Sequence, residues 1–168
     1  MKNHLSPLYL FLLIVGMGCW NSCQNGTAQK YPTLSLLSQG MPVSVLAPDS
    51  AQIKTEDWIV QKTVVLTSEP DNYFMRVSSR PAKHFELAAA KTAIREEVEE
   101  GDSFHEVVED KSSGFIFGKK LDSALVSYDF RHLELKGDRL YVFQIEMVPQ
   151  VFSLEEAREM YRYASAGK

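Results

Sequence analysis

The sequence predicts an α+β domain, with a mainly antiparallel sheet and helices packed on it. Three observations support this class: β-branched segments paired across turns in the first half, a change of apolar period from two to 3.6 near residue 81, and a return to short strands before a last helix. The order strands, helix, strands, helix is typical of α+β folds. We expect one folded domain, over residues 34–168.

The segments before the first predicted helix indicate three strands. Residues 43–47 are mainly apolar, contain alternating valines and end at a Pro-Asp turn, which predicts a short strand. Residues 58–67 are rich in β-branched side chains, and residues 72–79 alternate between two faces. The turn-forming residues 68–71 separate these two segments, so we expect an antiparallel hairpin.

A helix is predicted from about Pro81 to Gly101, because apolar residues recur there every three or four positions and Gly101 is placed to end it. A meander of strands is then expected, since short apolar segments alternate with turn signals. Its last two strands are joined by a tight hairpin at residues 136–139. The strands are predicted at residues 104–109, 115–117, 124–135 and 140–147.

The chain ends in a second predicted helix. Ser153 and Glu156 have the spacing of a capping box, and Pro149 ends the strand before them. The apolar stripe that this helix presents to the sheet consists of Leu154, Ala157, Tyr161 and Ala164.

This order of elements, opened by the segment at residues 40–48, resembles PsbP-like domains. The resemblance covers most of the chain after the leader and concerns topology, without a diagnostic motif. It implies a three-layer sandwich used mostly in non-catalytic accessory or chaperone roles. Shared architecture transfers neither a function nor functional residues.

The first residues form a predicted secretory signal peptide at residues 1–22. Lys2 supplies the positive start, and residues 8–17 form an apolar run of the right length, too short to span a bilayer comfortably. The polar residues 24–32, which lack periodicity and contain Gly and Pro, predict a flexible tether.

A cysteine directly after such an apolar run resembles the lipobox of bacterial lipoproteins, in which the cysteine is lipidated on sulfur and becomes the new amino terminus. Cys23 is favoured because Ser22 precedes it and polar residues follow, and Cys19 is the alternative. The resemblance implies a lipidated cysteine and tether at residues 23–33, and an exported protein anchored in the bacterial cell envelope, at the outer membrane on its periplasmic or surface side. The competing interpretation is an ordinary secretory signal cut near Ser22.

Charge and cysteine content exclude several classes. Lys2 is the one charged residue before Cys23, so 17 of the 18 Lys and Arg and all 22 Asp and Glu follow it, a net charge of −5. A nucleic-acid partner is not expected, because the basic residues are scattered and sit beside acids. Both cysteines lie in the leader region, so the domain has no disulfide and no thiolate chemistry.

An acidic stretch follows the first predicted helix and is the candidate partner-binding surface. Acids in the last helical turn oppose the helix dipole, which slightly favours a partner over a merely solvated helix end. The candidate residues are Glu96, Glu97, Glu99 and Glu100.

No catalytic residue, metal site or cofactor is predicted. The segment from His105 to Glu109 has glutamate where the H-E-x-x-H motif needs its second histidine, and its valines favour a strand. His84 and His132 are the other histidines beyond the leader, and no nucleophile or phosphate-loop motif occurs.

Three function hypotheses follow. The first is a non-enzymatic envelope lipoprotein whose domain binds another envelope protein or helps an assembly. The second is a lipoprotein that holds a small apolar ligand or lipid between helix and sheet. Its lining would come from Phe115, Phe117, Tyr128, Phe130, Tyr141 and Phe143. The third is a hydrolase that uses histidine and a carboxylate.

Overall fold

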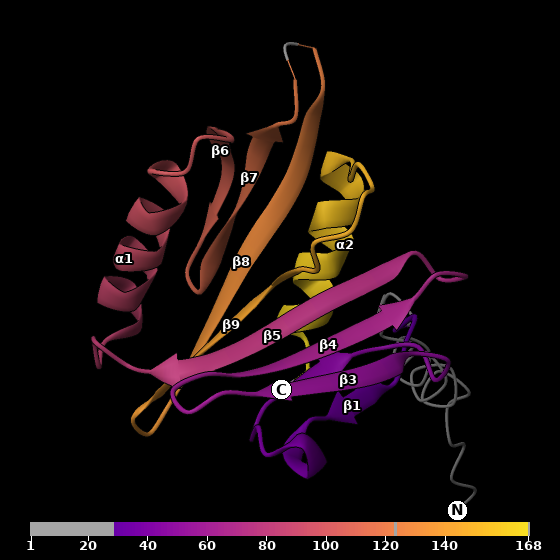
Figure 1. The fold of residues 1–168 in the computed structure, drawn as a ribbon, viewed down its shortest axis with the longest axis vertical. Coiled ribbons are helices and arrows are strands. Elements are labelled where there is room, and N and C mark those ends of the chain that lie inside the picture. Colours follow the sequence, from indigo (N-terminus) through magenta and orange to yellow (C-terminus); the bar gives the residue numbers. More distant parts are fainter. Residues whose placement is uncertain (1–28, 123, 168) are drawn as a thin grey trace, which may run out of the picture. The chain divides into compact units, whose positions relative to one another are not determined.

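The computed structural model describes residues 29–122 and 124–167, and the chain divides into two compact units, Met1–Lys30 and Tyr31–Lys168. The second unit confirms the predicted α+β class, because seven strands form one antiparallel sheet with two α-helices on it (Figure 1). In chain order the elements are β1 Thr33–Ser35, the 3-10 helix η3 Leu37–Gln39, β2 Ser44–Leu46, β3 Gln52–Asp57, β4 Lys62–Ser68, β5 Tyr73–Pro81, α1 Leu87–Glu99, β6 Phe104–Lys111, β7 Gly114–Lys120, β8 Val126–Lys136, β9 Arg139–Ile145 and α2 Leu154–Ser165.

The large sheet has the strand order β3-β4-β5-β9-β8-β7-β6, and every pair of neighbours is antiparallel. The predicted first hairpin is β4 and β5, which pair from Lys62 opposite Ser79 onwards. The predicted meander is β6 to β9, in which consecutive strands are neighbours. Because β5 pairs with β9, α1 connects the middle of the sheet to its far edge.

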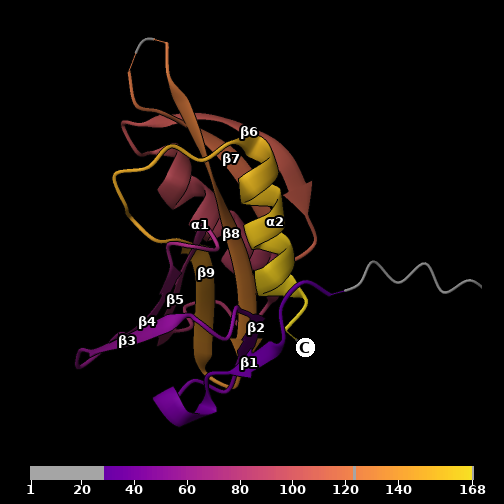
Figure 2. The ribbon, with the colours of Figure 1, turned by 90° about the vertical axis from the view of Figure 1, so that its right-hand side faces the viewer.

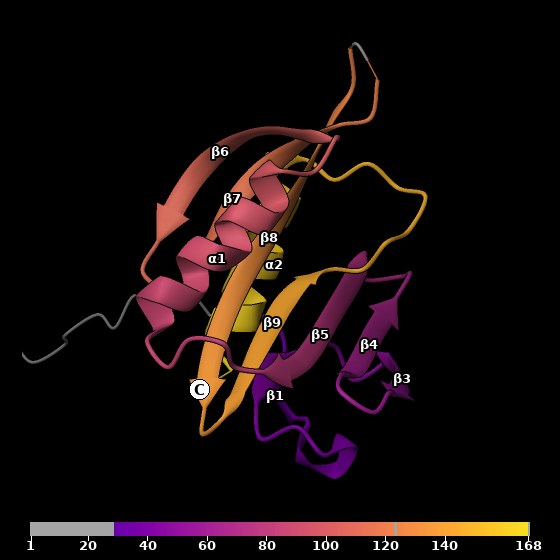
Figure 3. The ribbon, with the colours of Figure 1, turned by 60° about the vertical axis from the view of Figure 1, so that its left-hand side comes forward.

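The two helices cover opposite faces of the sheet. Figure 2 looks onto α2 with the sheet behind it, and Figure 3 brings α1 to the front. α1 contacts β6 and β8, and its Ala90 and Ile94 are buried in one core with Phe115 and Leu133. α2 packs mainly on β8, and the small β1–β2 sheet shares its core on the same face.

The central strands are buried on both faces, which explains their apolar runs. Successive residues of a strand point to opposite sides. On β9, Val142 therefore faces α1 and Phe143 faces α2. On β8, Leu133 likewise faces α1 and Phe130 faces α2.

α2 begins at the predicted capping box. Ser153 Oγ accepts a hydrogen bond from the backbone N–H of Glu156, and the Glu156 carboxylate accepts one from the backbone N–H of Ser153. These bonds satisfy N–H groups that the first helical turn leaves without partners. Ala157, Tyr161 and Ala164 of the predicted stripe are buried.

The structure differs from the sequence prediction at two element boundaries. The strand expected over residues 58–67 starts only at Lys62, and residues 58–61 form the loop after β3. β3 was not predicted, because this edge strand is largely exposed and shows no apolar alternation. α1 starts at Leu87 and not near Pro81, since Pro81 still belongs to β5.

Packing in the folded unit begins at Tyr31. Its ring lies 5.9 Å from that of Tyr73 and 5.1 Å from that of Tyr163, measured between centroids. The carbonyl oxygen of Pro32 accepts a hydrogen bond from the backbone N–H of Ala47. The chain thus enters the domain beside the first residue of β5.

Candidate binding surface

The predicted anchor lies outside the described residues. The predicted signal peptide at residues 1–22 and the candidate lipidation sites Cys23 and Cys19 all precede residue 29. None of the helices in residues 29–122 and 124–167 combines the length and apolar character that crossing a membrane requires.

The four predicted partner-binding glutamates lie in the last turns of α1 and at its C-cap, and all are exposed. Glu97 accepts hydrogen bonds of 2.9 and 3.0 Å from Nη2 of Arg80, and Glu99 accepts one of 2.6 Å from Nε of Arg95. The other two form no ion pair with any residue that the structure describes. The group therefore presents two unpaired carboxylates and two partly neutralised ones.

Two acidic residues further along the chain, Glu109 and Asp110, are tied to cations on both helices. Hydrogen bonds from Lys111 and then from Arg158 of α2 lower the pKa of Glu109. A hydrogen bond from Lys91 of α1 lowers the pKa of Asp110. These carboxylates connect β6 to the helices and are not free to bind a partner in the same way.

The histidines beyond the leader lie in three separate parts of the fold. His84 is in the loop before α1, His105 is near the start of β6, and His132 is in the middle of β8. His105 and Glu109 are on a strand, so they lack the helical convergence of a zincin motif. Within the described ranges, no three His, Cys, Asp or Glu residues come together as a metal site.

His132 belongs to a row of polar side chains under α2. Its side chain is buried, its Nδ1 lies 3.2 Å from Ser113 Oγ, and that oxygen lies 3.3 Å from the hydroxyl of Tyr161. Its Nε2 lies 3.6 Å from Glu134 Oε1 and forms no hydrogen bond with a described residue. Burial raises the pKa of Glu134, but His132 and Lys136 outweigh it and lower the pKa overall.

The Ser113–His132–Glu134 row contains the group types of a serine hydrolase. An imidazole within reach of a hydroxyl can accept the proton of that hydroxyl, and a carboxylate on the far side of the ring stabilises the imidazolium that forms. Here the rings of Phe143 and Tyr161 lie 5.2 and 5.5 Å from the imidazole. Because the imidazole is enclosed, its contact with Ser113 also has a structural role: it gives a buried polar side chain a hydrogen-bond partner.

Three consecutive large apolar side chains are exposed in the β3–β4 loop: Trp58 by 68%, Val60 by 65% and Ile59 completely. We call these three residues the apolar tip. β3, on one side, is largely polar and contains the ion pair Lys54–Glu56, and the ion pair Lys62–Asp57 lies at the base of the loop. An apolar cluster with a polar surround is typical of an interaction site.

Sequence patterns alone place the apolar tip in a strand, because two of its residues are β-branched. The sequence nevertheless contains a pattern that distinguishes these residues from a strand with one buried face. A strand with one buried face alternates apolar and polar side chains, whereas residues 58–60 are three apolar residues in succession after a polar segment.

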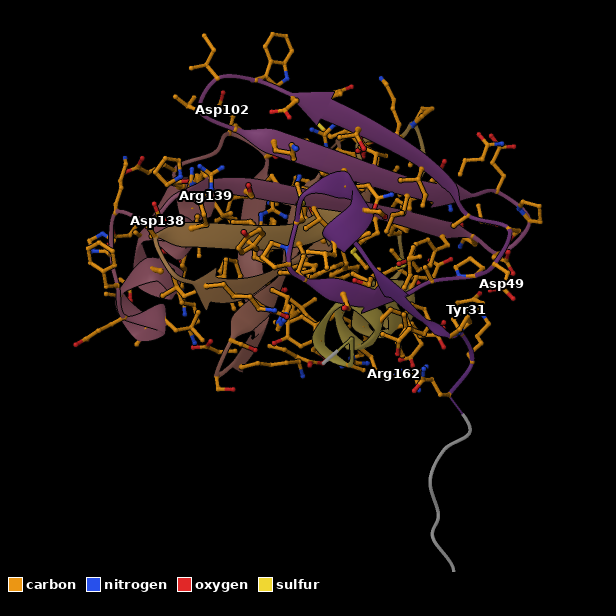
Figure 4. The ribbon with its side chains drawn as sticks, turned by 90° about the horizontal axis from the view of Figure 1, so that it is seen from below. Tyr31, Asp49, Asp102, Asp138, Arg139 and Arg162 are labelled. Atoms are coloured by element: carbon orange, nitrogen blue, oxygen red, sulfur yellow. The ribbon has the colours of Figure 1, made fainter. Side chains whose placement is uncertain are left out.

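The apolar tip and the start of the folded unit lie at opposite ends of the sheet. Lys62, just after the tip, pairs with Ser79 near the end of β5, whereas Tyr31 contacts Tyr73 at its start. The nine residues of β5 span about 30 Å at about 3.3 Å per residue. In Figure 4 Tyr31 lies on one side of the view, and Asp138, in the turn after β8 and beside the end of β5, lies on the other.

The aromatic residues proposed to line an apolar cavity are mostly core residues, and they are divided between the two faces of the sheet. Tyr128 is half-buried. The buried members are Phe115, Phe117, Phe130, Tyr141 and Phe143. Because the sheet separates Phe115 and Phe117 from the others, the set does not line one common cavity.

Comparisons with known proteins show no relative: no family model matches the chain, no curated protein matches it, and no solved structure matches its fold. Fold and surface therefore define only a class, an α+β domain with an exposed apolar hairpin loop.

Proposed function

We propose that this protein is a non-enzymatic, lipid-anchored protein of the bacterial cell envelope whose domain binds another envelope protein through the apolar tip. The observation that carries the proposal is the exposure of Trp58, Ile59 and Val60 at the end of the β3–β4 hairpin. Tryptophan is enriched at the energetic centres of protein interfaces. Burying such a side chain contributes about 1.5–3 kcal/mol.

The predicted anchor favours a partner protein over the anchoring membrane as the occupant of the tip. Acyl chains on Cys23, or on Cys19, tether the domain through the segment that enters it at Tyr31. The eight residues 23–30 reach at most about 28 Å when fully extended. The apolar tip lies at the other end of the sheet, which leaves it accessible to proteins beyond the anchoring membrane.

The glutamates of α1 offer a second contact. Glu96, Glu97, Glu99 and Glu100 give this part of the surface a negative charge that suits a basic region of the partner. Charged groups at the edge of an interface mainly accelerate and orient association, and buried apolar groups supply most of the affinity. We therefore assign the glutamates to steering and the apolar tip to affinity.

Photocrosslinking in intact cells tests the proposal. A photoreactive amino acid at position 59 is expected to give one discrete adduct with an envelope protein. Position 121 is the matched control, because Leu121 is an exposed apolar residue near the end of β7. The identified partner is then purified and titrated with the chain that begins at Cys23. The double change Ile59→Ser and Val60→Ser is expected to weaken binding at least about 100-fold.

Two outcomes reject this assignment. Adducts with lipid alone at position 59 make the tip a membrane-contacting loop, and an unchanged affinity of the double variant removes the tip from the interface. Charge reversal of the four glutamates with no effect on the association rate excludes their steering role.

A hydrolase is a second candidate function, favoured by the Ser113–His132–Glu134 row. A fluorophosphonate probe is then expected to label Ser113, and the label is lost in the variants Ser113→Ala and His132→Gln. Ser112→Ala is the control, because it changes the neighbouring hydroxyl. Failure of the probe to label the folded protein excludes a nucleophilic Ser113.

A further inference from the structure

A polar cleft lies between α1 and the strands β5, β8 and β9. Its volume is about 220 Å³. The apolar part of its lining includes Ile94 and Val98 of α1. The polar part is Gln61, Ser78, Arg80, Glu97, Arg131 and Gln144.

Arg131 is held rigidly, and part of its hydrogen-bonding capacity remains unused. Its Nη1 donates to Asp129 Oδ2 at 3.0 Å and to the carbonyl oxygen of Phe130 at 2.7 Å, and its guanidinium lies 5.1 Å from the ring of Phe117. Its Nε and Nη2 donate to no described residue. Neither is among the buried polar atoms that lack a partner, so both contact solvent.

The carboxylate behind Arg131 stays ionised although it is buried. Burial raises the pKa of Asp129, but Arg131 and Lys119 outweigh this effect, so its pKa lies below the usual value. Its Oδ1 also accepts hydrogen bonds from the backbone N–H groups of Phe130 and Ile145. Both carboxylate oxygens of Asp129 therefore have partners. Asp129 holds the guanidinium of Arg131 in position and leaves its Nε and Nη2 donors available.

Arg80 is held by one ion pair, which is more exposed than the pair between Arg131 and Asp129. Its Nη2 donates to both carboxylate oxygens of Glu97, and its Nε and Nη1 donate to no residue that the structure describes. The side-chain amide of Gln144, also in the lining, makes no hydrogen bond within the described chain. The hydroxyl of Ser78 has one long contact, 3.5 Å to the carbonyl oxygen of Val142.

We propose that this cleft binds a small organic monocarboxylate. Guanidinium groups pair with carboxylates through two parallel hydrogen bonds, and Arg131 and Arg80 both retain suitable donors. The apolar part of the ligand then packs on Ile94 and Val98. A ligand with a single negative charge fits best, because Glu97 lies in the lining and Asp129 behind it, and both repel a doubly charged phosphate.

This proposal uses none of the three residues of the apolar tip. It shares Glu97 with the proposed steering surface, and Gln61 of the lining directly follows the tip. The lining residues are far apart in the sequence, from residue 61 to residue 144, so the cleft forms only when the chain is folded. Arg131 is held in place before the ligand arrives, which reduces the entropy lost on binding.

Nuclear magnetic resonance titration of the chain that begins at Cys23 tests the site. The probe is 4-methylpentanoate, and the control ligand is 4-methylpentanamide, which has the same shape without the charge. Saturable shifts are expected at the Nε–H groups of Arg80 and Arg131 and at the side-chain amide of Gln144, with the amide ligand at least tenfold weaker. Inorganic phosphate at the same pH is expected to bind less tightly than the carboxylate.

Variants separate a specific site from general charge attraction. Arg80→Gln and Gln144→Leu are each expected to weaken binding at least fivefold with the remaining spectrum unchanged. Arg95→Gln is the matched control, since it removes a positive charge from α1 outside the cleft lining, and it is expected to change affinity less than twofold. The proposal is overturned by non-saturable shifts, by equal binding of the amide, by tighter binding of phosphate, or by equal losses in Arg95→Gln and Arg80→Gln.

Discussion

The hydroxyl of Tyr73 donates a hydrogen bond of 2.9 Å to the backbone carbonyl oxygen of Leu46 and so connects β5 to β2. The Tyr73 ring is buried together with those of Tyr31 and Tyr163. This contact ties the small sheet to the large one at the end opposite the apolar tip. It therefore helps to define where the chain enters the domain.

Replacing Tyr73 with phenylalanine tests this contact, because the ring stays and only the hydroxyl is lost. Tyr73→Phe is expected to lower the free energy of unfolding by about 1–3 kcal/mol, since the Leu46 carbonyl oxygen loses a buried donor. The measurement is urea denaturation. Tyr128→Phe is the control, because Tyr128 is half-buried and its hydroxyl makes no hydrogen bond in the described part of the chain. Equal effects of the two changes contradict the prediction.

Alkaline pH is expected to destabilise the fold through its buried tyrosines. Burial, followed by the nearby Tyr163 and Tyr31, raises the pKa of Tyr73 above its ordinary value of 10.0. Burial also raises the pKa values of Tyr141 and Tyr161. A raised pKa in the folded state means that the stabilisation is complete below about pH 10 and is lost as the pH rises through the folded-state values.

Urea midpoints measured between pH 8 and pH 11.5 check this dependence. The free energy of unfolding is expected to fall steadily above about pH 10, with phenolate absorbance appearing together with unfolding. Tyr73→Phe is expected to flatten the decline, because one buried group no longer ionises. Phenolate absorbance that develops fully before unfolding contradicts burial of these hydroxyls.

Asp129 is the buried charge on which the arrangement around Arg131 depends. Asp129→Asn is expected to lower the free energy of unfolding by about 3–5 kcal/mol, because it leaves Arg131 and Lys119 near an uncharged group. Asp110→Asn is the matched control at an exposed ion pair, where the loss is expected to be at most about 1 kcal/mol. Comparable losses in the two variants, measured by thermal denaturation, reject the central role of Asp129.

The same residue predicts an acid dependence. The pKa of Asp129 lies below its usual value of 3.8 in the folded state, so its stabilisation is complete above about pH 4 to 5 and is lost as the pH falls through the folded-state value. Asp129→Asn should reduce this loss.

Local sequence patterns were sufficient to predict the elements that depend on contacts between residues close in sequence. The capping box of α2, the β4–β5 hairpin and the turn at Gly137, whose φ is +60°, all depend on residues close in sequence. β3 was not predicted, because the sequence does not reveal its hydrogen bonds to β4 and because its side chains are mostly exposed. Such an edge strand lacks the alternation by which strands are recognised.

The candidate sites could be predicted only in part, because they depend on distant pairings. The acidic end of α1 is local and was predicted as a surface, whereas its ion pair with Arg80 of β5 is not visible in the sequence. The polar cleft needs β8 beside β9 and β9 beside β5, which brings Arg131 and Arg80 to one face. The contact of His132 with Ser113 likewise depends on the pairing of β7 with β8.

The capping box offers a prediction confined to α2. Ser153→Ala is expected to lower the free energy of unfolding by about 1 kcal/mol, because the backbone N–H of Glu156 loses its acceptor. Hydrogen bonds from the Ser153 hydroxyl and backbone also lower the pKa of Glu156, so part of this stabilisation is lost as the pH falls below the usual value of 4.5. Ser112→Ala, an exposed serine in the β6–β7 turn, serves as the control. No difference between the two variants by urea denaturation contradicts a role of the cap.

The apolar tip is expected to matter for binding and not for folding. Changing Trp58, Ile59 and Val60 together to serine should alter the free energy of unfolding by no more than about 0.5 kcal/mol per residue, because these side chains are exposed. Leu66→Ala on the adjoining β4 is the matched control and is expected to cost about 2–5 kcal/mol, since Leu66 is completely buried. Chemical denaturation of both variants measures the difference. A large loss of stability in the triple variant contradicts the assignment, since it means that the tip packs within the domain and is not available to a partner.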